Sequence, residues 1–230
     1  MKYVLTFVKT DRMIYISHLD LMRAFLRALR TGGLAPSYSQ GFNPHPKMSF
    51  ALPLPLGVHS VCELLEFETG HGAAVGGIPA LALPEGLRVT GFREKPPGYA
   101  KPLASYVTAA SYEIMCPGIS GAPGLMEAFF AEEHVWVAKR AKRGKGAASA
   151  DAPEARKDIR PQMLGWEEKH NNMHGRMLVH VTLASGAGNV LNPLRFFEAF
   201  CRHAGLDKDA LCPVITRTAI LAGKEVCDFA

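Results

Sequence analysis

The chain has 230 residues and a formal net charge of +5, and apolar residues make up 48% of it. This is enough apolar material for a sizeable core, and enough length for one large domain or two small ones. No stretch approaches the roughly 18 uninterrupted apolar residues of a membrane helix, and the opening MKYVLTFVKTDR becomes charged too early for a secretory signal. We therefore expect a cytoplasmic protein without a membrane partner.

Basic residues gather in two parts of the sequence. Residues 1–60 carry seven Lys or Arg against two Asp or Glu, and a second basic run, KRAKRGK, occupies residues 139–145. A local excess of positive charge favours anionic partners such as phosphate backbones. Solubility alone also explains a mildly basic protein. The charge pattern therefore points towards a nucleic acid without identifying one.

The cysteines offer no evident site for a metal ion or a cluster. No pair has the C-x-x-C spacing with which one loop presents two thiolates. The five cysteines are widely scattered, at Cys62, Cys116, Cys201, Cys212 and Cys227. We expect reduced, mostly buried thiols, with no metal and no cofactor.

The N-terminal segment predicts a strand followed by an amphipathic helix. Residues 2–9 alternate loosely between apolar and polar side chains, and residues 13–16 are expected to be extended. Ser17 is the expected helix N-cap, with Asp20 three residues later as in a capping box, and Gly32 ends the helix. Apolar residues recur at helical spacing on one face. Another face carries Arg23, Arg27 and Arg30.

Residues 37–57 cannot form a helix, because four prolines and two glycines interrupt them. We expect strands over 47–52, 62–69 and 87–93, and at most a weak helix over 70–86. These elements follow the order β-α-β-β-(α)-β of a ferredoxin-like lobe.

The second half of the chain repeats this order more faintly. A basic loop rich in Gly, Ala and Ser, residues 140–156, is expected to be mobile. We expect helices over 124–133 and 193–203, the second capped by Asn192, and strands over 106–116, 135–139, 158–167, 176–184 and 214–221. The predicted fold is α+β, with two tandem ferredoxin-like (βαββαβ) lobes, 1–95 and 105–230, joined by a Pro-rich linker at 96–104.

Polar residues near the first helix are the strongest candidates for chemistry. If the lobe folds as predicted, His18 at the helix start can lie near His45 and Lys47 of the following loop. The histidines would then form an acid/base pair, and the lysine would hold a phosphate. Local hydrogen bonding by His18 and a rigid structural loop at 43–46 explain the same residues without catalysis, so both interpretations stay open.

The candidate substrate-binding residues combine this polar cluster, the arginines of the helix and basic residues of the second half. They are Tyr15, Ser17, His18, Arg23, Arg27, Arg30, Gln40, Asn43, His45, Lys47, Lys139, Arg140, Lys142, Arg143 and Arg160.

Two blocks of the sequence resemble a known family. YISHLDLMRAFLRALRTGGL at 15–34 and SYSQGFNPHPKMSFALPLPLG at 37–57 are similar to the radical-SAM-linked domain family of uncharacterised bacterial proteins. Members of that family occur alone or fused behind a radical SAM enzyme, and KDIRPQMLGW and ITRTAIL are similar to its weaker blocks. Because this chain lacks the C-x-x-x-C-x-x-C motif that binds the cluster of such an enzyme, the resemblance implies an accompanying module whose enzyme is a separate chain.

Three functions are consistent with these features. The first is an accessory module that recognises structured RNA, ribosomal or transfer RNA, for a radical SAM enzyme. The second is a metal-independent endoribonuclease that uses His18, His45 and Lys47. Its expected architecture resembles the repeat-RNA endoribonucleases of CRISPR systems at the level of the fold alone. The third is a protein-only adaptor that docks through the Pro-rich segment 52–57.

Overall fold

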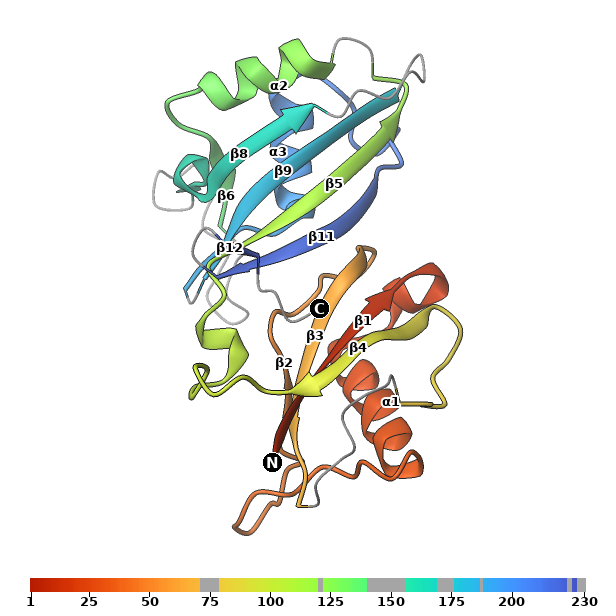
Figure 1. The fold of residues 1–230 in the computed structure, drawn as a ribbon. Coiled ribbons are helices and arrows are strands. Elements are labelled where there is room, and N and C mark those ends of the chain that lie inside the picture. The colour runs from red at the N-terminus through yellow and green to blue at the C-terminus, as the bar shows by residue number, and fades with distance from the viewer. Residues whose placement is uncertain are drawn as a thin grey trace. The chain divides into compact units, whose positions relative to one another are not determined.

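The computed structural model describes residues 1–70, 79–119, 122–139, 156–168, 176–186, 188–222 and 225–226. These residues form an α+β fold with three α-helices (Figure 1). The chain divides into two compact units. Unit 1 comprises Met1–Ser111, Ser185–Gly188 and Ile215–Ala230, and unit 2 comprises Tyr112–Ala184 and Asn189–Val214. None of the helices within the described ranges is both long enough and apolar enough to span a membrane.

Unit 1 is built on an antiparallel arrangement of four strands. Its elements are β1 (Lys2–Lys9), the 3-10 helix η1 (Asp11–Tyr15), α1 (His18–Thr31), β2 (Met48–Phe50), β3 (His59–Glu68), β4 (Leu87–Glu94) and the 3-10 helix η2 (Leu103–Ser105). The strands are ordered β2-β3-β1-β4, and each is antiparallel to its neighbour. β1 and β2 therefore run in the same direction on either side of β3, which is the arrangement of a split βαβ unit.

A strand from the far end of the chain also pairs with β3. β11 (Val214–Ala222) runs parallel to the beginning of β3, with Thr216 opposite His59 and Arg217 opposite Ser60. The short β12 (Glu225–Val226) pairs with the end of β11. Because β11 is parallel to β3 while the other pairs are antiparallel, the sheet of unit 1 is mixed.

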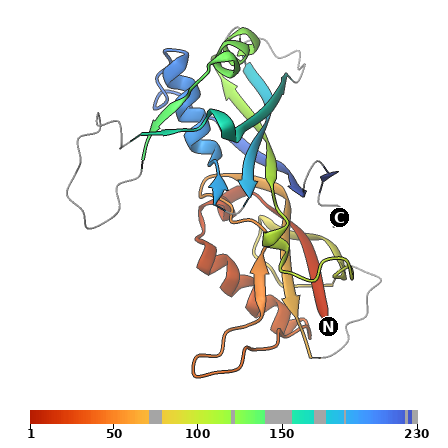
Figure 2. The same ribbon diagram turned by 90° about the vertical axis from the view of Figure 1, so that its left-hand side faces the viewer.

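The hydrophobic core of unit 1 lies between its strands and α1 (Figure 2). Alternate residues of β1 point towards the helix, and among them Phe7 packs against Phe25 of α1 with ring centroids 4.5 Å apart. The core comprises Tyr3, Leu5, Phe7, Leu21, Phe25, Leu29, Phe50, Leu65, Phe67, Leu87 and Val89. The helical spacing of Leu19, Met22, Leu26 and Leu29 predicts this face only in part, because Leu19 is 64% exposed and the buried face is centred on Phe25.

Both ends of α1 agree with the sequence prediction. Ser17 caps the N-terminus, because its Oγ accepts a hydrogen bond from the backbone N–H of Asp20 at 3.1 Å. Gly32 is the C-cap, and Gly33 follows with φ +76°, in the left-handed region that favours glycine. These caps fix the length of the helix and hence the positions of the side chains on its exposed face.

Buried charged residues lie on the core side of the sheet of unit 1, at one end of its hydrophobic core. Glu63 lies opposite Phe7 in the pairing of β3 with β1, so its side chain points to the core side. Arg217 of β11 donates to Glu63 Oε1 at 2.7 Å and to the carbonyl oxygens of Leu52 and Pro53, and the Arg217 and Glu63 side chains are only 1% and 2% exposed. Lys9 is buried near this pair, and its burial lowers the pKa of its ammonium group.

Unit 2 combines a sheet with two packed helices and a separate two-stranded ribbon. Its elements are β5 (Ala109–Pro117, which begins in unit 1), α2 (Ala122–Ala131), β6 (Trp136–Ala138), β7 (Arg156–Asp158), the 3-10 helix η4 (Arg160–Gln162), β8 (Met163–Glu168), β9 (Arg176–Gly186), β10 (Asn189–Val190) and α3 (Pro193–His203). β9 pairs with β5, β8 and β10, and among the described residues β6 and β7 form a two-stranded sheet. Phe129 of α2 packs between Phe196 and Phe200 of α3, with ring centroids 5.6 and 5.7 Å away.

Several predicted elements differ from those observed. Residues 13–16, expected to be extended, fall largely in the 3-10 helix η1, whose first residue, Asp11, has a positive φ of 51°. Residues 79–86 contain no helix, and 71–78 lie outside the described residues. Most of the predicted mobile loop, 140–155, also lies outside them, and Arg156 belongs to β7. The tandem ferredoxin-like arrangement therefore stays a prediction.

Candidate nucleic-acid interface

The exposed face of α1 carries a row of arginines. Arg23, Arg27 and Arg30 are all exposed, while the opposite face of the helix is buried. Arg23 donates to Asp20 Oδ1 at 3.0 Å, and water screens an exposed pair of this kind, so it contributes little to stability. Hydrogen bonds from Ser17 and Arg23 lower the pKa of Asp20, so that carboxylate stays ionised at neutral pH. Three guanidinium groups against one carboxylate leave the face positively charged.

A hairpin between α1 and β2 extends away from the strands of unit 1 (Figure 2). Tyr38 and Pro46 form a β-bridge at its base, and Ser39 and His45 exchange two hydrogen bonds of 2.8 and 2.9 Å. Arg30 donates to the Tyr38 hydroxyl, and its guanidinium carbon lies 5.7 Å from the centroid of the Tyr38 ring. A cation–π contact therefore joins the last arginine of the α1 row to the base of the hairpin.

The tip of the hairpin is exposed and uncharged. Gln40 and Asn43 are exposed, and the Phe42 side chain is completely exposed. Gly41 turns the chain with φ +127°, a conformation that favours glycine. No Lys, Arg, Asp or Glu occurs between residues 34 and 46. Such a tip suits an apolar contact better than a phosphate group.

His45 and Lys47 line the same pocket of unit 1. Its volume is about 320 Å³, and its other lining residues include Glu66 and Glu68. Lys47 Nζ donates to Glu68 Oε1 at 3.0 Å, and this hydrogen bond lowers the pKa of Glu68. The ammonium group of Lys47 therefore already has a carboxylate partner, which reduces its value as a clamp for a phosphate.

His18 does not line this pocket. It is the exposed first residue of α1, and its ring meets the edge of Phe50, with ring centroids 5.3 Å apart. Phe50 points from β2 into the core beneath α1, whereas Lys47, three residues earlier, points to the other side of the strand. The structure thus brings His45 and Lys47 together without His18. The remaining candidate of this cluster, Tyr15, is exposed on η1.

Arg160 binds the backbone of unit 2. Its Nε donates to the carbonyl oxygen of Glu132 at 3.0 Å, and its Nη2 donates to that of Phe130 at 2.8 Å, both near the C-terminal end of α2. A third hydrogen bond of 3.3 Å joins Nη1 to the carbonyl oxygen of Met163. The last carbonyl groups of a helix have no hydrogen-bond donor within the helix, and the guanidinium of Arg160 provides such a donor. Its guanidinium is therefore part of the fold of unit 2.

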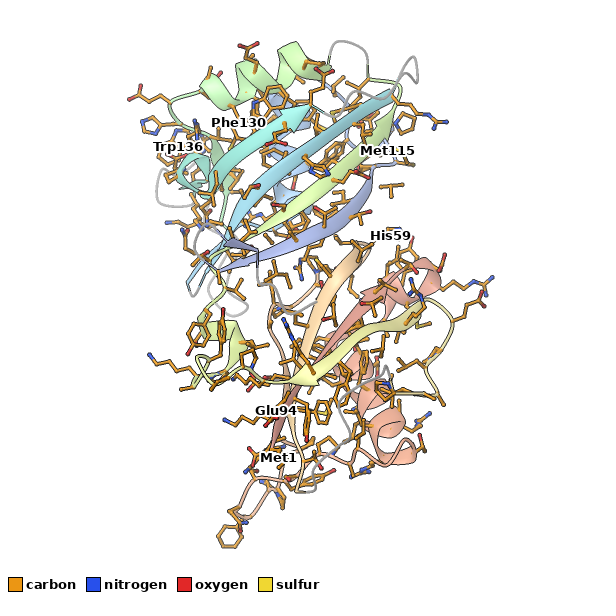
Figure 3. The ribbon with its side chains drawn as sticks, viewed as in Figure 1. Met1, His59, Glu94, Met115, Phe130 and Trp136 are labelled. Carbon is orange, nitrogen blue, oxygen red and sulfur yellow. The ribbon has the colours of Figure 1, made fainter. Side chains whose placement is uncertain are left out.

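A second pocket, of about 350 Å³, lies in unit 2 beside the ribbon formed by β6 and β7. It is lined by Trp136, Val137, Ala138, Arg156 and Arg202. Trp136 lies opposite Asp158 and Ala138 lies opposite Arg156. Paired residues of a ribbon point to the same side, so the Trp136 and Arg156 side chains share one face. The Trp136 residue is 50% exposed. Figure 3 labels its side chain in unit 2.

Two arginines of α3 hold the backbone of β6. Arg202 Nη1 donates to the carbonyl oxygen of Trp136 at 3.2 Å, and Arg195 donates to that of Ala138. Seven residues separate the two arginines, which places them on one face of the helix. The strand that presents the Trp136 indole is thus fixed to the helix that supplies guanidinium groups.

His134 completes the surroundings of Trp136. Its Nδ1 lies 2.8 Å from Asp158 Oδ2, and this hydrogen bond raises the pKa of the imidazole. The His134 and Trp136 ring centroids are 5.6 Å apart. At neutral pH the raised pKa increases the fraction of imidazolium, so the exposed indole has cationic groups around it.

Sequence reasoning did not single out Trp136, Arg156 or Arg202. The available signal was an aromatic residue on a strand directly before the basic run at 139–145. The pairing of Arg202 with Trp136 joins residues 66 positions apart, which no local pattern contains. Of the predicted basic residues, Lys139 is exposed after β6, and Arg140, Lys142 and Arg143 lie outside the described residues.

Comparison with known proteins adds a family. Residues 2–193 match the model of a family described as an uncharacterized protein conserved in bacteria (DUF2344), so the match covers well over half of the 230 residues. No curated protein matches the chain. Because that description names no activity, the function has to be argued from the surfaces described above.

Proposed function

We propose a function for this chain, which belongs to that family of uncharacterized bacterial proteins: it is an accessory module that binds structured RNA and presents it to a separate radical SAM enzyme. The link to the enzyme comes from the sequence blocks at 15–34 and 37–57, which resemble the radical-SAM-linked domain family. This assignment places the protein in the cytoplasm, where ribosomal and transfer RNA are found.

The exposed arginine row of α1 is the observation that carries the RNA assignment. Arg23 and Arg30 are seven residues apart, which corresponds to roughly 10 Å along a helix. A rigid row of this length can follow one or two phosphate steps of a nucleic-acid strand. Arg27, in the middle of the row, is exposed, and Asp20, which is the one acidic residue of α1, pairs with Arg23. The charge therefore remains available to an anionic partner.

RNA binding can be tested by reversing the charge of this row. The variant Arg23→Glu with Arg27→Glu should weaken binding to a fluorescein-labelled RNA stem-loop by at least tenfold in an anisotropy titration, because it replaces two positive charges by two negative charges where phosphates should lie. The matched control is Arg88→Glu with Lys2→Glu, which makes the same change at residues away from α1. Equal affinities of the two double variants would exclude the α1 row as the RNA surface.

A protein-only adaptor is the second candidate, and the hairpin tip favours it. Phe42 is a fully exposed aromatic residue on an uncharged tip, which suits an apolar socket of a partner protein. The Pro-rich segment 52–57 supports this function less well, because the carbonyl oxygens of Leu52 and Pro53 accept hydrogen bonds from Arg217 of the same chain. Absence of RNA binding at low salt would leave this adaptor as the better account.

A further inference from the structure

The Trp136 pocket has features that the α1 surface lacks. It combines a half-exposed indole with two arginines in a concave site of about 350 Å³, a volume within the usual range for small-ligand pockets. Leaving so much indole surface in water costs free energy, which is regained when a planar group covers the ring. A ligand that binds on the indole should therefore have a flat, apolar group.

The charges around the pocket define what that partner should carry. Arg156 and Arg202 line the pocket. Arg202 uses one donor on the Trp136 carbonyl oxygen, and a guanidinium has five N–H donors. Asp158 accepts hydrogen bonds from His134 and from the backbone N–H groups of Val135 and Arg160. Arg202 Nη2 lies 4.0 Å from Glu198 Oε1, and an exposed ion pair of this kind is weak in water. The partner should therefore be an anion as well as planar.

We infer that the Trp136 pocket of unit 2 binds an unpaired base of single-stranded nucleic acid, which stacks on the indole while Arg156 and Arg202 hold the adjoining phosphates. Aromatic side chains bind unpaired bases by stacking, with little dependence on the base, and guanidinium groups form paired hydrogen bonds with phosphate oxygens. The inference rests on the proposed RNA-binding function and names the part of the RNA that unit 2 recognises. A stem-loop would supply both duplex phosphates and unpaired bases.

Tryptophan fluorescence gives a direct test, since the chain has two tryptophans. The variant Trp166→Phe leaves Trp136 as the sole indole. We expect a short single-stranded oligoadenylate to quench its emission saturably, because a stacked base quenches an indole. Inorganic polyphosphate of equal charge provides the matched ligand control: it has phosphates without bases and should leave the emission largely unchanged.

Substitutions separate stacking from charge. On the Trp166→Phe background the binding readout for these variants is anisotropy of labelled oligoadenylate. Trp136→Leu should weaken binding roughly tenfold, whereas Trp136→Phe, which keeps an aromatic ring, should retain most of it. Arg156→Gln should lower the salt slope by about one. Circular dichroism of each variant shows whether it is folded.

The outcomes of these tests distinguish the pocket from the α1 surface. Stem-loop binding that depends on Arg23 and Arg27, without any quenching of Trp136, overturns the pocket inference and leaves the proposed function standing. Quenching by polyphosphate equal to that by oligoadenylate also overturns it, because the site would then not recognise a base. Quenching by oligoadenylate that is indifferent to the α1 variants supports the pocket, and stem-loop binding that is equally indifferent to them removes the role of α1.

Discussion

Arginine serves opposite purposes in two regions of unit 1. Arg217 lies in the core, 1% exposed, and each of its hydrogen bonds goes to a group of the same chain. Arg27 lies on the outer face of α1, where water can reach it. A buried guanidinium needs such partners to offset its lost hydration, while an exposed one keeps its charge for an external ligand. Net charge alone does not distinguish a structural arginine from one that is available to a ligand, whereas burial does.

Arg217→Met is the sharpest test of the buried group and should have the largest effect on stability. The substitution leaves the Glu63 carboxylate and two carbonyl oxygens without their donor. Removing one partner of a buried ion pair costs about 3–5 kcal/mol, and we expect the lower end because Lys9 still lies near Glu63. The free energy of unfolding in urea measures this loss.

Two further variants locate the origin of that loss. Lys9→Met should cost much less than Arg217→Met, because burial and Arg217 already disfavour the charged form of Lys9. Combining Glu63→Leu with Arg217→Met should recover most of the stability, since no uncompensated carboxylate remains. A double variant as unstable as Arg217→Met would show that the carbonyl contacts, not the ion pair, hold β11.

Arg160→Met tests whether the same distinction holds in unit 2. We expect a loss of about 1–3 kcal/mol in the free energy of unfolding, because carbonyl oxygens of Phe130, Glu132 and Met163 lose their donor. RNA affinity, measured by anisotropy, should stay close to wild type. A tenfold loss of affinity in a fully folded variant would instead make Arg160 a contact residue.

Local patterns in the sequence predicted the elements that local chemistry controls. The Ser17 cap and the Gly32 end of α1, and the Asn192 cap of α3, are all observed where predicted. Each depends on residues within a few positions of one another, so the sequence contains the whole signal. The exposed arginine row of α1 follows from the same helical spacing.

The side-chain contacts that sequence reasoning missed join distant residues. Glu63 interrupts an apolar strand, and its partner Arg217 lies 154 positions later, so no spacing rule could pair them. His18 and His45 were expected together because both precede elements of the same lobe. His18 packs against Phe50, on the core side of β2, whereas Lys47 points to the other side of this strand. A shift of one residue in the strand would exchange the two sides, and the sequence pattern did not define that register.

Ser17→Ala should have a moderate effect on stability and none on RNA affinity. It removes the hydroxyl that caps α1, and loss of such a cap costs about 0.5–2 kcal/mol. The arginines stay on the same face of the folded helix. Thermal unfolding monitored by circular dichroism measures the loss of stability. Ser49→Ala, at an exposed serine outside the helix, is the control. A cap variant as stable as the control would show that the Oγ contact contributes nothing.

His134 should produce the smallest effect, a weak dependence of stability on pH. Its hydrogen bond to Asp158 raises its pKa above the ordinary 6.5, so the contribution is complete below pH 6.5 and is lost as pH rises through the folded-state pKa. The pKa of Asp158 is lowered, because the effect of its hydrogen bonds outweighs that of its burial. The contribution of Asp158 to stability is therefore lost only at acidic pH. His134→Gln should reduce the change in the free energy of unfolding with pH above pH 6.5. The same pH dependence in the variant and the wild type would contradict this assignment.

The salt dependence of RNA binding tests the central claim most directly. If α1 contacts phosphates, the logarithm of the affinity for the stem-loop should fall linearly with the logarithm of salt concentration, and each arginine replaced by glutamine at positions 23, 27 and 30 should reduce that slope by about one. Arg88→Gln should leave the slope unchanged. Equal slopes for wild type and the triple variant, or no binding at low salt, would contradict the assignment of the α1 face to RNA.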